Sequence, residues 1–111
     1  MSRFTRHIAR QLMGYTLGSQ AKSFNPLVLA KVDDRFGWAS WYLTEYDPES
    51  RIARAYVKSH AMQGWVTLSV DALDEQRWYG LFRYAFLDRQ FQPKHFKQLQ
   101  ARMMTTPRMP H

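Results

Sequence analysis

Apolar and basic side chains alternate through the first residues with the period of a helix. The apolar positions recur three or four residues apart and so share one helical face: Phe4, Ile8, Leu12 and Tyr15. Arginines lie together on the opposite face, at Arg3, Arg6 and Arg10. The pattern predicts an amphipathic helix over residues 3–15, followed by a polar loop rich in Gly, Ser, Asn and Pro that ends near Pro26.

Alternation with a period of two predicts β-strands in the middle of the chain. The short apolar run Leu27–Val32 is a first strand, and Trp38–Tyr46 is the most strand-like segment. The sequence Asp47–Ser50 contains Asp and Pro in the order that favours a turn, and Ile52–Lys58 alternates as the returning strand of a hairpin.

The segment Trp38–Tyr46 is expected to divide its side chains strictly between two faces of the sheet. On one face we expect Ala39, Trp41 and Leu43. The other face would carry Trp38, Ser40, Tyr42, Thr44 and Tyr46.

The second half of the chain predicts one more strand, then helical segments. Gly64–Leu68 is a strand, and Ser69 is placed to cap a short helix from Val70 to about Gln76. The apolar density of Trp78–Phe91 suits a buried strand or a buried helix, and its periodicity leaves both open. Pro93 suits the first turn of a closing helix that carries one apolar stripe, formed by Phe96, Leu99 and Met103.

This order of elements predicts a single α+β domain over residues 1–104. We expect a mainly antiparallel sheet of about four strands, with helices at the N- and C-terminal ends. The tail, residues 105–111, is expected to be frayed. No segment approaches the length of a membrane-spanning helix, and the arginine-rich start does not resemble a secretory signal.

Composition adds a strongly basic balance and a lack of cysteine. Sixteen Lys and Arg against nine Asp and Glu give a formal net charge of +7, which attracts polyanions such as nucleic acid, or an acidic protein surface. The sign of the charge argues against a protein that imitates DNA. Because cysteine is absent, disulfides, thiolate metal sites and cysteine nucleophiles are excluded, and a cytoplasmic location is expected.

Three segments, in their order and spacing, resemble a known family. They are Trp41–Glu49 with its Trp-Tyr-x-Thr-Glu-x-Asp-Pro motif, Gly64–Leu68 leading to Ala72–Leu73, and Asp88–Pro93. Together they are similar to an uncharacterised bacterial family of unknown function that occurs on plasmids, phages and integrative elements. The resemblance implies a mobile-element context and assigns no chemistry.

Catalytic residues are harder to find. Carboxylates at Asp33, Asp34, Glu45, Asp47 and Glu49 could hold a hard cation in a metal-dependent nuclease, but the acid-x-lysine sequence usual in such sites is missing. Turn formation explains the carboxylates better. A pairing of His60 with Glu45 or Asp47 is a weaker alternative to a solvated histidine. We therefore expect no catalytic site, no cofactor and no metal.

Binding residues are more numerous, and both terminal helices contribute to them. The expected phosphate contacts are Arg3, Arg6, Arg10, Arg54, Lys58, Lys94, Lys97 and Arg102. If the two helices pack side by side, these charges form one stripe. Exposed aromatic rings would stack on unpaired bases or contact a partner, at Trp38, Tyr42, Tyr56 and Trp65.

The sequence thus favours a non-catalytic protein that binds nucleic acid or a nucleoprotein complex. The alternative is a protein-binding inhibitor or accessory factor that acts on a host defence system, such as an anti-phage or restriction complex. A metal-dependent nuclease is the third possibility. No membrane association is expected, because the apolar face of the first helix is better explained by packing on the sheet.

Overall fold

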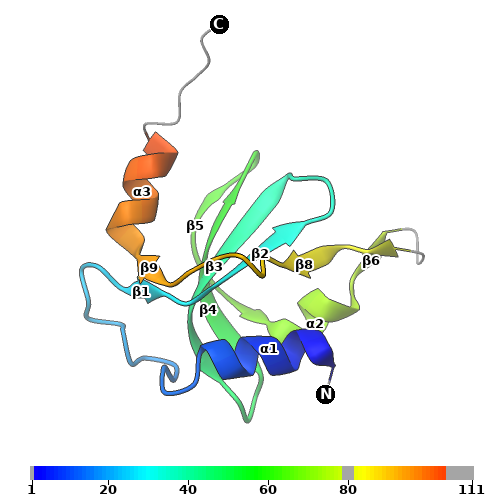
Figure 1. Ribbon diagram of the computed structural model, residues 1–111, viewed down its shortest axis with the longest axis horizontal. Helices are drawn as coiled ribbons and strands as arrows, with labels where there is room; N and C mark the ends of the chain where they lie inside the picture. Colours follow the sequence, from blue (N-terminus) through cyan, green and yellow to red (C-terminus); the bar gives the residue numbers. More distant parts are fainter. Residues whose placement is uncertain (1, 79–81, 105–111) are drawn as a thin grey trace, which may run out of the picture.

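The computed structural model describes residues 2–78 and 82–104. Its centre is a five-stranded antiparallel sheet of strand order β5-β4-β3-β2-β8 (Figure 1). The strands of this sheet are β2 (Ala30–Asp34), β3 (Ala39–Asp47), β4 (Ile52–Ser59), β5 (Gln63–Ser69) and β8 (Ala85–Leu87). Two short pairs flank it, namely β1 (Leu27–Val28) with β9 (Lys94–His95) and β6 (Arg77–Trp78) with β7 (Phe82–Arg83). The expected α+β class and antiparallel sheet are confirmed, whereas the expectation of about four strands is too low.

Two helices cover the face of the sheet that carries Leu43, here called the Leu43 face. They are α1 (Arg3–Gln11) and α2 (Val70–Glu75). The predicted apolar stripe of α1 is confirmed, because Phe4, Ile8 and Leu12 are all buried in the same core cluster as Leu43. The helix is shorter than expected. Its C-cap is Leu12, and Gly14 follows with a positive φ of 88° that an α-helix does not continue through.

The closing helix α3 (Phe96–Met104) packs on the opposite face, here called the Tyr42 face. Its buried side chains Phe96 and Leu99 contact a second cluster that contains Tyr42. Neighbouring strand residues point to opposite faces, so Leu43 and Tyr42 separate the two clusters. The single basic stripe that side-by-side terminal helices would make is therefore not formed.

The start of α3 also differs from the expectation for Pro93. A short strand, β9, lies between Pro93 and the helix, which begins at Phe96. The first turn is capped from the loop before β1, because the Lys97 N–H donates to Asn25 Oδ1 at 2.8 Å and the Phe96 N–H to the Pro26 carbonyl at 2.8 Å. These bonds fix α3 relative to the sheet.

The faces of β3 change partway along the strand. Up to Leu43 the pairing with β4 is regular, and then a β-bulge at Thr44 shifts the register between Leu43 and Glu45. A bulge adds one residue and reverses the alternation beyond it. Tyr46 therefore packs in the same cluster as Leu43, which corrects the expectation that it shares a face with Tyr42.

The segment left open between strand and helix contains strands in its described part. Trp78 belongs to β6, and Ala85–Leu87 forms the edge strand β8 against β2. Residues 79–81 of this segment, and the tail predicted to be frayed, lie outside the described residues. In the stretches 2–78 and 82–104, no helix has the length and apolar character needed to cross a membrane.

Candidate functional site

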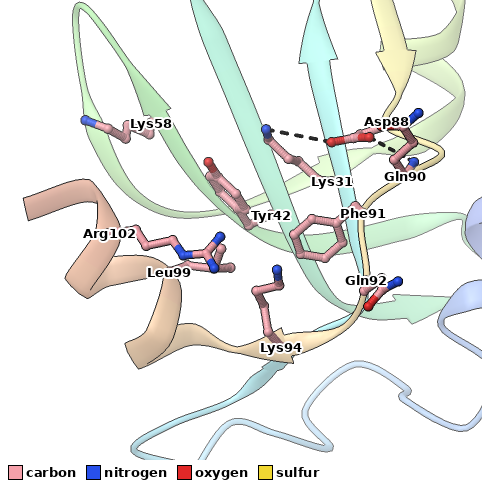
Figure 2. A pocket seen from close by; sticks show the side chains of 10 residues that line it. All are labelled: Lys31, Tyr42, Lys58, Asp88, Gln90, Phe91, Gln92, Lys94, Leu99 and Arg102. Atoms are coloured by element: carbon pink, nitrogen blue, oxygen red, sulfur yellow. Dashed lines mark hydrogen bonds and ion pairs between the residues drawn. The ribbon is translucent and has the colours of Figure 1, made fainter. Parts of the chain in front are cut away.

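A groove of about 590 Å³ opens between the Tyr42 face of the sheet and helix α3 (Figure 2). Its cationic side chains come from four separate elements. Lys31 belongs to β2, Lys58 to β4, Lys94 to β9 and Arg102 to α3. The fold thus brings together charges that are up to 71 positions apart in the sequence, counted from Lys31 to Arg102.

The groove also has aromatic and apolar walls. Tyr42 and Leu99 are buried and lie at its inner side, and Phe91 is half-buried. Two lysines lie over these rings, with Lys31 Nζ 5.8 Å from the centroid of Tyr42 and Lys94 Nζ 5.4 Å from that of Phe91. Such cation–π contacts keep an ammonium group near the groove at modest energetic gain.

Two acids partly compensate this charge. Lys31 Nζ lies 3.9 Å from Asp88 Oδ2 and 3.5 Å from Asp33 Oδ1, so Lys31 is engaged within the protein. Asp88 also accepts the Gln90 N–H at 3.0 Å and thereby shapes the turn beside the groove. In the described part of the chain, neither Lys58 nor Lys94 makes an ion pair, so both remain available to an anion.

The remaining predicted residues of the sheet and α3 lie outside this groove. Arg54 covers the Trp65 ring, with its Cζ 5.2 Å from the centroid, and Lys97 is exposed near the start of α3. Tyr56 and Trp65 pack on Phe96, with ring centroids 4.8 and 5.0 Å away. The expected exposure of Tyr42 is wrong, because its side chain is only 8% exposed.

Trp38 lies in a different surface region. It is 52% exposed and stacks on Phe36, with ring centroids 4.8 Å apart. Next to it lies a largely apolar depression of about 580 Å³, here called the apolar hollow. It lies near the start of β3 and the connection between β4 and β5. Its lining includes Trp38, Trp41, Val57, Met62, Val66 and Tyr84.

The arginines of α1 form a second cationic region, here called the α1 patch. It consists of Arg3, Arg6, His7 and Arg10 of the helix with Arg89, which follows β8. Partial burial and then the positive charges of Arg89, Arg10, Arg3 and Arg6 lower the pKa of His7. The nearby positive charges disfavour the imidazolium form in addition to the effect of burial. A hollow of about 400 Å³ lies within this region, lined by Arg3, Phe4, His7, Phe86, Leu87 and Arg89.

The groove contains residues that the sequence interpretation did not select. Lys31 lies within the apolar run Leu27–Val32, and the register places it directly opposite Tyr42 on β3. Strand alternation therefore carried a usable signal for Lys31. Phe91 and Gln90 reach the groove through a turn after β8, and no periodicity in the sequence marks them.

The carboxylates are held apart by local hydrogen bonds. Glu45 is 1% exposed and accepts backbone N–H groups from Gly18 and Gln20 at 2.8 and 2.9 Å. Asp47 accepts the Ser50 hydroxyl at 2.6 Å, and this bond and the backbone N–H groups of Glu49 and Ser50 lower its pKa. Across residues 2–78 and 82–104, no cluster of three or more acids and histidines is suited to a metal ion.

The suggested pairing of His60 with Glu45 or Asp47 is not formed, and Asp47 is paired in register with Ile52 at the other end of β4. Glu45 is paired in register with Arg54, and His60 follows the end of β4. Six residues of extended strand separate Arg54 from His60, which corresponds to about 20 Å. The hydrogen bonds of Asp34 likewise serve a turn, since its Oδ1 accepts the Trp38 N–H at 2.6 Å.

Comparisons with protein families, with curated proteins and with solved structures find no match for this chain. The family resemblance of the motif around Trp41 therefore remains a prediction, as does the mobile-element context it implies.

Proposed function

We propose that this protein binds nucleic acid, without catalysis, and that the groove between the sheet and α3 holds the sugar-phosphate backbone. The observation that carries the proposal is the convergence of Lys31, Lys58, Lys94 and Arg102 on one groove from four elements. A solvated surface explains scattered charges, but it does not explain why like charges gather around a hollow. Gathering them raises their mutual repulsion, which a bound polyanion relieves.

The shape and lining of the groove favour a single strand. Half-buried Phe91 lies among the cations, where an unpaired base has an apolar surface to contact. Phosphate contacts would supply most of the affinity and little sequence preference. In this reading Lys58 and Lys94 contact phosphates, and Lys31 is held in place by Asp88 and Asp33.

The first test measures fluorescence anisotropy of labelled single-stranded DNA, duplex DNA and RNA, titrated with nuclease-treated protein at low and physiological salt. We expect micromolar or tighter binding of a single strand. In the variant Lys58→Ala/Lys94→Ala/Arg102→Ala, affinity should fall at least ten-fold. The slope of log K against log salt should fall by about 2, because each lost contact to a single strand removes about 0.7.

The matched control is Lys97→Ala. This residue is exposed on the same helix as Arg102 but does not line the groove, so the substitution removes one charge at a neighbouring place. Lys97→Ala should leave the affinity nearly unchanged, whereas Lys94→Ala should lower it. Equal losses for Lys94→Ala and Lys97→Ala would contradict the groove as the contact surface, and binding that vanishes at physiological salt would contradict the function.

The apolar hollow favours a second candidate function, which is capture of a protein partner. Trp38 and Met62 are 52% and 49% exposed there, and exposed apolar side chains grouped around a depression are typical of protein contacts. In the mobile-element context that the motifs suggest, such a partner would belong to a host defence or element-encoded complex. Absent nucleic-acid binding in the test above would favour this candidate.

A further inference from the structure

The groove and the α1 patch meet at one short turn. Asp88 and Gln90 line the groove, whereas Arg89 between them lines the hollow beside α1. The turn is closed by hydrogen bonds from the Phe91 N–H to the Asp88 carbonyl at 3.3 Å and from the Gln90 N–H to Asp88 Oδ1 at 3.0 Å. Consecutive residues of this one turn therefore line the two hollows.

Edge strand β8 explains this arrangement. It is the last strand of the main sheet, so the chain that leaves it at Asp88 passes around the sheet edge from the Leu43 face to the Tyr42 face. Leu87 packs toward α1, and Phe91 packs with the cluster beneath α3. The segment between them is the boundary of both cationic surfaces, and its Arg89 lines the hollow beside α1.

We infer that one nucleic-acid strand occupies both surfaces, leaving the groove at Gln90 and continuing around the sheet edge onto the α1 patch. This inference rests on the proposed function and adds a path to it. The alternative arrangement, two independent sites for two strands, requires surfaces that are separated, and here they share a turn.

His7 provides an internal reporter of the second half of this path. Its pKa is lowered in the free protein by partial burial and by Arg89 from the sheet edge together with Arg10, Arg3 and Arg6 of its own helix. A phosphate seated among these arginines neutralises part of their charge and favours the imidazolium form. Binding at the α1 patch should therefore raise the pKa of His7, and by linkage affinity should increase as the pH falls through that pKa.

The experiment compares oligothymidylates from about 4 to about 16 nucleotides, the range of site sizes seen for single-strand-binding domains. The His7 ring is followed by NMR during pH titrations of the free and bound protein. We expect short oligonucleotides to bind the groove and leave the His7 pKa unchanged. Longer ones should bind at least ten-fold more tightly, at one strand per protein, and raise the His7 pKa.

Two variants test the α1 patch and the groove separately. Arg3→Ala/Arg10→Ala/Arg89→Ala should remove the gain in affinity with length while leaving short oligonucleotides bound as before. Lys58→Ala/Lys94→Ala should weaken both lengths. Because Arg3, Arg10 and Arg89 are exposed, their substitution spares the core, which circular dichroism can verify.

Three outcomes would overturn the inference. Short oligonucleotides that bind with no further gain on lengthening would leave the proposed function standing without the path. Two short strands per protein would indicate separate sites. A His7 pKa that rises only with anionic lipid vesicles, used as a parallel ligand, would assign the α1 patch to membranes. Absence of binding at every length would instead remove the proposed function itself.

Discussion

Glu45 shows how a candidate catalytic residue becomes a structural one. The sequence places it in a motif with Asp47, where it resembles an acid of a metal site. In the fold its carboxylate is turned to the loop after α1 and accepts the N–H groups of Gly18 and Gln20. Gln20 extends this link, since its side chain donates to the carbonyls of Leu27 and Thr44 at 2.9 Å. Glu45 therefore secures the loop that leads to the cap of α3.

This role predicts a stability effect for Glu45→Gln. The amide retains one acceptor oxygen and turns a donor toward a backbone N–H, so one buried hydrogen bond is lost and its donor is left unsatisfied. The free energy of unfolding should fall by about 1–3 kcal/mol, measured by urea denaturation. Glu49→Gln, an exposed carboxylate on the adjacent turn, is the control and should change it by less than about 0.5 kcal/mol. Equal stability of both variants would contradict the role.

The position of Lys31 could be predicted from the sequence, but its ion pairs could not. Its position opposite Tyr42 follows from strand register, which alternation could have provided. Its contacts with Asp33 and Asp88 do not follow, because Asp88 reaches it only through the pairing of β8 with β2. A strand pairing 55 residues apart, between Val32 and Leu87, has no signal in a single sequence.

At the scale of elements, α3 depends on a cap supplied from another part of the chain. Asn25 Oδ1 accepts the Lys97 N–H, and the Asn25 carbonyl lies 3.0 Å from His95 Nδ1. Gln98 adds a local cap by accepting the His95 N–H at 3.0 Å. Since α3 forms one wall of the groove, the cap links the loop before β1 to the proposed binding surface.

The prediction at this scale concerns Asn25→Ala. Loss of the cap should lower the free energy of unfolding by about 1 kcal/mol and also weaken single-strand binding, because the α3 wall becomes less fixed. Ser69→Ala removes the corresponding cap of α2, where Ser69 Oγ accepts the Ala72 N–H at 3.1 Å. It should cost similar stability without weakening binding. Thermal denaturation and anisotropy check both effects, and equal losses of binding in the two variants would contradict the link.

Local signals predicted most elements well. The stripe of α1, the Ser69 cap of α2 and the alternation of β4 are confirmed, because each depends on neighbours within a few residues. The bulge at Thr44 was not foreseeable, since nothing in the local sequence departs from strand alternation there. The prediction that Pro93 begins the closing helix is wrong. Proline suits both a helix start and an extended segment, and here the pairing of β9 with β1 makes the segment extended.

At the scale of the whole molecule, the net charge of +7 was visible at once, but its distribution was not. The sequence suggested one stripe formed by two adjacent helices. Instead α1 and α3 cover opposite faces, and Lys58 and Lys94 from the sheet and β9 complete the groove beside α3. Which helix packs on which face of the sheet depends on the tertiary structure. The grouping of the charges could therefore not be predicted from the sequence.

The surfaces proposed for the two candidate functions lie in different regions of the molecule. The groove lies on the Tyr42 face against α3, whereas the apolar hollow is lined by Trp41 and Val66 at the far end of the strands. Occupancy of one region therefore does not require occupancy of the other. A method that reports each residue during titration distinguishes them in one sample.

The most direct test of the central claim is a ¹H–¹⁵N NMR titration of the protein with a single-stranded oligonucleotide at physiological salt. We expect the amide signals of Lys31, Lys58, Lys94 and Arg102 to shift together and to saturate, while those of Trp38 and Met62 stay in place. Shifts confined to Trp38 and Met62, or no saturable shift in the groove, would contradict the assignment of the groove to nucleic acid.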